Sequence, residues 1–216
     1  MEVIAELLTR LGGKFSIELG IAVAAGPEER QKWFLVAILL GAPISGLLAS
    51  RTYRVMADQG ITSPEAVLSR GWDGLVVLLD EGGYTRYDFK TATKLLAAMT
   101  TLKEKYQGDL EHLAVTARDP VDLERRLQDL ASGIGPTTVN IFLRELRGIW
   151  PQAQPLLSPL ARMAADHLGL IPHDLPAAMA WEALATHWET QPVTGFEVTD
   201  LEAALVRLGR DFCRKP

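Results

Sequence analysis

Apolar residues recur at helical spacing along almost the whole chain, and alternating strand-like runs between turn signals are scarce. One segment shows the pattern clearly, with apolar side chains at i, i+3, i+4, i+7 and i+10: Val139, Phe142, Leu143, Leu146 and Ile149. Hydrophobic residues make up 48% of the 216 positions, which is ample for a core and excludes disorder of the whole chain. The sequence therefore predicts an all-α fold.

Local signals suggest where the helices begin and end. Pro27, followed by two glutamates, is typical of a first helical turn, and that helix should break at residues 41–43, Gly-Ala-Pro. Residues 72–79 are compatible with a strand or a buried helix, and we favour a helix. Thr199 with Glu202 is expected to cap the last helix. The signals together predict an amphipathic helix at the N-terminus and further helices from about residues 27, 45, 64, 84, 120, 136, 159, 174 and 199.

Charge limits the partners that the chain can bind. With 27 acidic and 22 basic residues the net charge is −5, which excludes a uniformly basic nucleic-acid coat but allows a local basic face. Residues 82–107 carry a net charge of +3, including Arg86, Lys90 and Lys94, whereas residues 165–216 carry −4. The two lysines, spaced i and i+4, indicate either a DNA-binding surface or an ordinary solvated helix face. The helix that carries them should turn Phe89 inward.

Cysteine, histidine and hydropathy patterns argue against several other classes of protein. Cys213 is the only cysteine, so the chain has no intramolecular disulfide and no four-thiolate iron–sulfur or zinc site. The four histidines show no metal-ligand spacing, and we expect no bound metal. Residues 33–50 are uncharged, but Gly41, Pro43 and Ser45 interrupt them, which favours a buried helix over a membrane span. Without a signal-peptide pattern, the expected compartment is the reducing cytoplasm.

A glycine-containing turn carries the strongest functional signal. Glycines let the backbone take positive φ and approach a ligand, and a turn that opens a helix presents consecutive N–H groups, an arrangement that binds phosphate. Such contacts position a duplex without reading its sequence. The alternative is that Gly-x-Gly only closes a helix-to-helix turn. The candidate DNA-binding residues are Arg86 and Lys90, with the turn residues Ser132, Gly133, Ile134, Gly135, Pro136, Thr137 and Thr138.

Residues 31–169 resemble the helix-hairpin-helix/Gly-Pro-Asp superfamily of base-excision-repair DNA glycosylases, in its endonuclease III-like branch. The resemblance covers roughly two thirds of the chain. The matching pieces, in order, are an apolar helix over residues 33–42, a Gly-Gly-Tyr turn at 82–84, a helix over 87–102 with Lys90 and Lys94, the hairpin Gly133-Ile134-Gly135, and a helix containing Arg162.

The resemblance implies a two-lobed helical fold with a helix-hairpin-helix motif near residues 130–150. One lobe would comprise residues 28–155, and the other would combine residues 1–27 with 156–216. It also implies binding to double-stranded DNA from the minor-groove side and flipping of a damaged nucleotide into a cleft. The resemblance is also compatible with a monovalent cation bound in the hairpin loop.

The chain departs from the family pattern at positions that carry chemistry. Bifunctional members use a hairpin lysine as an imine-forming nucleophile, and Thr137 stands at that position, so no abasic-site lyase activity is expected. Leu157 stands where the family has a catalytic aspartate, and the iron–sulfur cysteines are missing, so we expect no cofactor. If the chain excises bases, another carboxylate must act, and Asp88 is the candidate, with Asp80 and Glu81 nearby.

Three functional hypotheses follow. The first is a monofunctional DNA glycosylase-like repair protein that acts at damaged or abasic sites. The second is a family member that recognises lesions or duplex DNA without chemistry. The third is a helical scaffold or regulator that shares only the fold.

Overall fold

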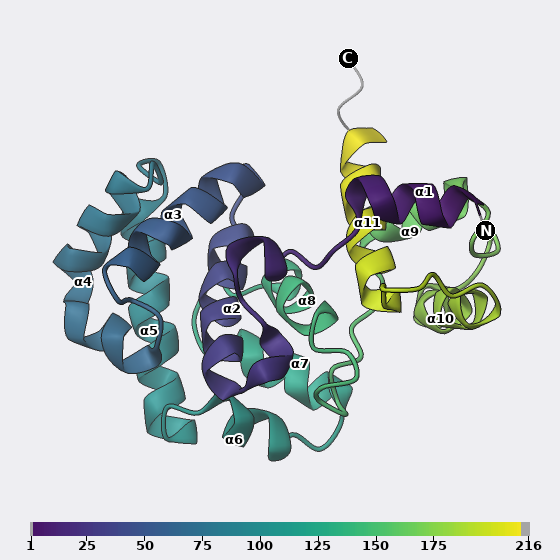
Figure 1. Cartoon of the computed structure of the whole chain (residues 1–216). Coiled ribbons are helices and arrows are strands. Elements are labelled where there is room, and N and C mark those ends of the chain that lie inside the picture. Colours follow the sequence, from purple (N-terminus) through teal and green to yellow (C-terminus); the bar gives the residue numbers. More distant parts are fainter. Residues whose placement is uncertain (1, 213–216) are drawn as a thin grey trace. The chain divides into compact units, whose positions relative to one another are not determined.

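The computed structural model describes residues 2–212, with side chains from residue 3 onward, and Cys213 lies outside that range. The described residues form helices and contain no strand, so the all-α prediction is confirmed (Figure 1). None of these helices is long and apolar enough to cross a membrane. Contacts divide the chain into a central unit, residues 19–154, and a terminal unit, which joins residues up to 18 with those from 155 onward.

The central unit contains seven α-helices among its described residues. Their bounds are α2 (Pro27–Leu40), α3 (Gly46–Asp58), α4 (Pro64–Glu81), α5 (Asp88–Tyr106), α6 (Leu110–Val115), α7 (Pro120–Gln128) and α8 (Pro136–Arg144). A short 3-10 turn, η2 (Val23–Ala25), precedes α2, and another, η1 (Ile17–Leu19), lies where the division falls. Residues 19–27, which the resemblance placed in the other lobe, fall in this unit by their contacts, and Arg30 Nη1 donates to the Val23 carbonyl there (2.9 Å).

Helix α2 forms the buried centre of this unit, as the uncharged stretch predicted. Every residue from 33 to 39 is buried, and α2 packs against both α5 and α8. Trp33 Nε1 donates to the Phe142 carbonyl (3.2 Å), and the Tyr84 hydroxyl donates to the Leu39 carbonyl (2.6 Å). These two bonds satisfy polar groups that would otherwise be costly to bury. The helix ends at Leu40, before the predicted Gly-Ala-Pro break.

Polar N-caps begin several helices where the sequence placed them. Ser45, Ser63 and Ser158 each accept from the backbone N–H three residues later (3.2 Å in each case), and Asp119 accepts from the Asp122 N–H (2.8 Å). Each bond satisfies one of the donors that a helix N-terminus leaves free. The ambiguous residues 72–79 are helical and follow a kink at Gly71, whose φ is 71°. The local signals were therefore sufficient for these boundaries.

Three expectations in the central unit are wrong. Helix α5 begins at Asp88 rather than near residue 84, because the Tyr84 hydroxyl is bonded to α2 and residues 84–87 form a turn. Phe89 is exposed, not inward. Helix α8 ends at Arg144, after which i→i−3 turns carry the chain onward, although Leu146 is still buried.

The terminal unit packs α1 (Glu2–Leu11) and α9 (Pro159–His167) against α11 (Val198–Phe212). Helix α10 (Ala180–Thr190) follows a 3-10 turn, η3 (Ala177–Met179), so it begins six residues later than predicted. The predicted Thr199–Glu202 cap is also wrong. Thr199 lies inside α11, and the Glu197 N–H donates instead to Asp200 Oδ2 (2.8 Å), because Asp200 is the residue that faces back to the helix start.

Candidate nucleic-acid interface

The turn between α7 and α8 exposes backbone donors. Gly133 has a φ of 89°, which only glycine adopts without strain, and Gly135 is extended and precedes the first-turn Pro136. The Ile134 N–H donates to the Ala131 carbonyl (3.1 Å) and closes the turn. Within the described chain, the N–H groups of Gly133, Gly135 and Thr137 have no acceptor. These donors lie where the dipole of α8 is positive and can therefore face an anion.

The side chains of the turn divide into two groups. Ser132, Gly133, Pro136 and Thr137 are exposed and Gly135 is half-buried, whereas Ile134 and Thr138 are only 4% and 1% exposed. Thr138 packs against the end of α2, where a Cβ added at Gly41 would lie 1.9 Å from Thr138 Oγ1. Ile134 and Thr138 therefore hold the turn in place and can reach a ligand only through their backbone.

A cavity of about 560 Å³ opens beside this turn. Three segments of the central unit form its wall: residues 41–43 after α2, one side of α5 with the residue before it, and the turn itself. From the turn come Ser132 and Gly133, and from the α5 segment come Tyr87, Phe89, Lys90, Thr91, Thr93, Lys94 and Ala97. The cavity thus joins two of the predicted basic residues to the predicted phosphate-binding turn.

Lys94 lies directly against the turn. A Cβ added at Gly133 would be 3.0 Å from Lys94 Cε and 3.6 Å from Lys94 Nζ, so glycine leaves the room that the lysine occupies. Lys94 is half-buried, and burial lowers the pKa of its ammonium group. No hydrogen bond or ion pair joins it to another described residue, and no carboxylate lines the cavity. The cavity is therefore cationic and lacks a counter-charge of its own.

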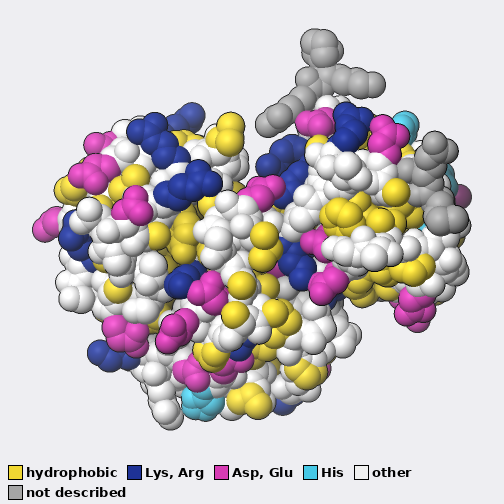
Figure 2. Space-filling model, viewed as in Figure 1, with side chains coloured by type: hydrophobic (Ala, Val, Ile, Leu, Met, Phe, Trp, Pro, Cys, Tyr) yellow, Lys and Arg dark blue, Asp and Glu magenta, His cyan; other side chains and the backbone are white. Residues whose placement is uncertain are grey.

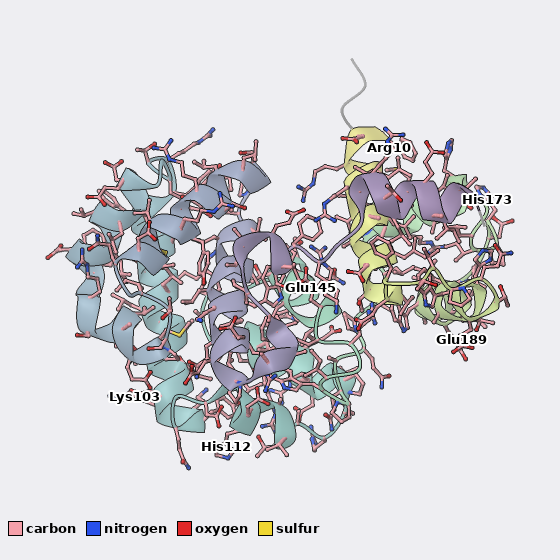
Figure 3. The ribbon with its side chains drawn as sticks, in the orientation of Figure 1. Arg10, Lys103, His112, Glu145, His173 and Glu189 are labelled. Carbon is pink, nitrogen blue, oxygen red and sulfur yellow. The ribbon has the colours of Figure 1, made fainter. Side chains whose placement is uncertain are left out.

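The other basic residues of this region lie in different places. Lys90 is exposed and lines the cavity, and exposed Arg86 lies over the Tyr87 ring, 5.6 Å from its centroid. Lys103 is in the last turn of α5, at the opposite end of the helix (Figure 3). On the face shown in Figure 2, basic and acidic side chains of the central unit are interspersed. The positive charge of residues 82–107 is thus only partly gathered at the cavity.

The candidate catalytic carboxylate does not line the cavity. Asp88 is the first residue of α5, between Tyr87 and Phe89, and its Oδ1 accepts from the Phe89 N–H (2.7 Å). Asp80 and Glu81 are exposed at the end of α4 and lie outside the lining as well. The sequence grouped these carboxylates with the site, but the cavity wall does not include them.

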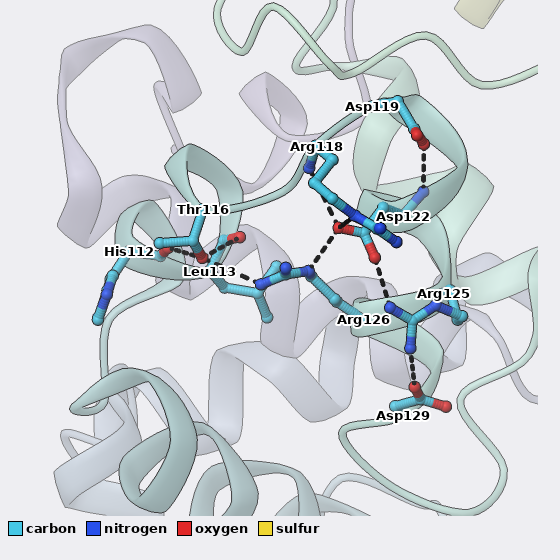
Figure 4. Close-up of polar contacts among 9 residues, drawn as sticks. All are labelled: His112, Leu113, Thr116, Arg118, Asp119, Asp122, Arg125, Arg126 and Asp129. Atoms are coloured by element: carbon cyan, nitrogen blue, oxygen red, sulfur yellow. Dashed lines mark hydrogen bonds and ion pairs between the residues drawn. The ribbon is translucent and has the colours of Figure 1, made fainter.

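Asp122 of α7 forms a charged cluster that the sequence analysis did not identify (Figure 4). Its buried carboxylate accepts from the Arg118 backbone N–H (3.1 Å), from Arg126 Nε (2.9 Å) and from Arg125 Nη2. The Arg118 backbone bond, and then the arginine side chains, hold the pKa of the Asp122 carboxyl well below its usual range. Asp122 offsets part of the charge of these arginines, and none of them lines the cavity, so the cluster stabilises the start of α7 rather than adding to the cationic cavity.

The two positions of the terminal unit that the resemblance singled out, Leu157 and Arg162, provide no carboxylate. Leu157 is buried in the core of that unit, and Arg162 Nη2 donates to the Leu175 carbonyl. His173 pairs with Asp166 (2.8 Å), and no described group of three or more His, Cys, Asp or Glu residues could hold a metal ion. Figure 3 shows His173 on the terminal unit and His112 on the central one.

The sequence analysis did not include Lys94 among the candidate DNA-binding residues and expected Phe89 to be buried, whereas both residues line the cavity. A usable signal was present, because Tyr87, Lys90, Lys94 and Ala97 are spaced i, i+3, i+7 and i+10 and so share one side of α5. In comparisons with known proteins, no family model matches this chain and no curated protein matches it. The site is therefore interpreted from its own geometry.

Proposed function

We propose that this protein binds double-stranded DNA at damaged or abasic positions, as a base-excision-repair protein of the helix-hairpin-helix/Gly-Pro-Asp type. The observation that carries the proposal is the close approach of Gly133 and Lys94, where a free backbone N–H and an unpaired lysine lie at one cavity. Amides at a helix start and ammonium groups are both phosphate ligands. Lys90 adds a second charge at the same wall.

The salt dependence of binding follows from these contacts. Each phosphate neutralised on duplex DNA contributes about −0.9 to the slope of log K against log salt concentration. Lys90 and Lys94 together should account for a slope of about −2, and any further basic contacts add to it. The amides should orient the sugar–phosphate chain rather than distinguish base sequences.

Recognition without excision is the form of this function that the cavity favours. Hydrolysis of a glycosidic bond develops positive charge on the sugar, which a carboxylate stabilises, and the cavity wall has none. Monofunctional base excision is the second candidate, because Asp88 lies between two residues that line the cavity. Thr137 offers no amine, so the hairpin position itself forms no imine.

Fluorescence anisotropy with duplexes that contain an abasic-site analogue, uracil, a mispair or an oxidised base tests the proposal. Lys94→Gln should weaken binding and make the salt slope less negative by about 0.9. Lys103→Gln is the matched control, because it removes the same charge nine residues further along α5, about 14 Å from Lys94 along the helix axis, at a position that does not line the cavity. Mass detection of released base on the same duplexes separates excision from recognition. Equal effects of the two variants would contradict the assignment of the cavity.

A further inference from the structure

Two aromatic side chains are exposed beside the cavity. Phe89 of α5 is 59% exposed and Trp72 of α4 is 40% exposed, although large aromatic rings usually bury most of their surface. Their ring centroids are 5.3 Å apart with an interplanar angle of 42°, so they form one continuous aromatic surface across the two helices. Trp72 is the most exposed of the described tryptophans.

Hydrogen bonds hold the Trp72 indole in a fixed orientation behind the Phe89 ring. Trp72 Nε1 donates to Thr93 Oγ1 (3.0 Å), and the same hydroxyl donates to the Phe89 carbonyl (2.8 Å). Gly71, with its positive φ, turns the chain immediately before Trp72. The fixed indole supports one side of the Phe89 ring, so that ring has less freedom to lose when a ligand stacks on its other side, which favours binding.

Phe89 and Thr93 also line the cavity that contains Lys90 and Lys94. An exposed ring next to unpaired ammonium groups fits a ligand that has a flat apolar face and a negative charge, and a nucleotide combines the two. A base inside a duplex has both faces covered by its neighbours, so away from the duplex ends a base must leave the stack before it can lie on Phe89.

We propose that Phe89 is a stacking platform for an unpaired nucleobase, with the adjoining phosphate at Lys90 and Lys94 and with Trp72 as the positioning residue behind the ring. The proposal rests on the proposed function, because it takes DNA as the ligand. It adds the surface on which an extruded or single-stranded nucleotide would stack, namely Phe89 supported by Trp72.

The test compares three oligonucleotides by fluorescence anisotropy: a paired duplex, the same duplex with a one-nucleotide bulge, and the single strand. Phe89→Ala should weaken binding of the bulged duplex and the single strand about ten-fold and change binding of the paired duplex less than about two-fold. Phe89→Tyr should retain binding because it keeps an aromatic face, whereas Phe89→Leu should behave like alanine. Val77→Ala is the control, because Val77 is exposed on α4 and does not line the cavity.

Trp72 gives a second readout. The bulged duplex should quench its fluorescence, and Trp72→Phe should abolish that change and weaken binding of the bulge by less than Phe89→Ala. Equal losses on paired and bulged DNA for Phe89→Ala, or full rescue by leucine, would overturn the stacking platform while leaving duplex binding intact. Absence of binding to all three oligonucleotides would instead refute the proposed function itself, and the platform with it.

Discussion

Replacing Gly41 by alanine should destabilise the central unit at the point where α2 meets α8. The new Cβ would lie 1.9 Å from Thr138 Oγ1 and 3.0 Å from Thr138 Cβ, both far inside normal contact. Thr138 is buried, so its side chain has little room to move. Overpacking of this kind costs about 1–3 kcal/mol, and here we expect the upper half of that range.

Second substitutions at Thr138 test the assigned cause. Thr138→Ala removes the closest atom and leaves the 3.0 Å contact, so the double variant should recover part of the lost stability. Thr138→Val keeps an atom in the same place and should recover none. Urea denaturation followed by circular dichroism measures each effect as a shift in midpoint at unchanged slope. A Gly41→Ala protein as stable as the wild type, or equal rescue by valine and alanine, would refute the reasoning.

Three further outcomes are expected. Asp122→Asn should lower stability at neutral pH, and its difference from wild type should shrink as the pH falls below about 4. The pKa of Asp122 is lower in the folded than in the unfolded chain, so the charged carboxylate stabilises the fold above the unfolded-state pKa, and this contribution is lost as the carboxylate is protonated. Urea midpoints across pH measure the difference. Lys94→Met should raise or preserve stability at pH 7 while weakening DNA binding. Burial of the charged ammonium group destabilises the fold and lowers the pKa of Lys94, so any gain from Met should shrink toward pH 10, where the wild-type lysine loses its charge. A Met variant clearly less stable than wild type would contradict this. Ser158→Ala should lower the free energy of unfolding by about 1 kcal/mol, because it removes the N-cap of α9. Ser69→Ala is the control in the same denaturation assay and should cost less than about 0.5 kcal/mol, because Ser69 is exposed inside α4.

The sequence predicted those helices whose boundaries depend on nearby residues. Ser63 and Asp119 cap the helix that follows each of them, and proline occupies the first turn, so three or four residues contain the signal. The start of α5 depended instead on a bond between Tyr84 and the Leu39 carbonyl, residues far apart in the chain. The sequence analysis expected Phe89 to be buried, because it assumed that a helix starting at residue 84 had a continuous apolar face.

The candidate site was predicted only in part. The glycine turn is a local pattern, and the structure shows its free donors at the start of α8. The cavity depends on a close approach of Gly133 to Lys94 and of Gly41 to Thr138, pairs separated by roughly 40 and 100 residues. One sequence without relatives to compare contains no signal for such pairs.

The most direct test of the central claim compares two glycines of the central unit. Gly133 and Gly148 both have positive φ, 89° and 76°, so alanine strains the backbone at either position, but only a Cβ at Gly133 would meet Lys94. The measurement is the affinity for a duplex with an abasic-site analogue as a function of salt. The account predicts that Gly133→Ala weakens binding and flattens the salt dependence while Gly148→Ala leaves both unchanged. Unchanged binding by a folded Gly133→Ala protein, or no binding of duplex DNA by the native chain at moderate salt, would contradict it.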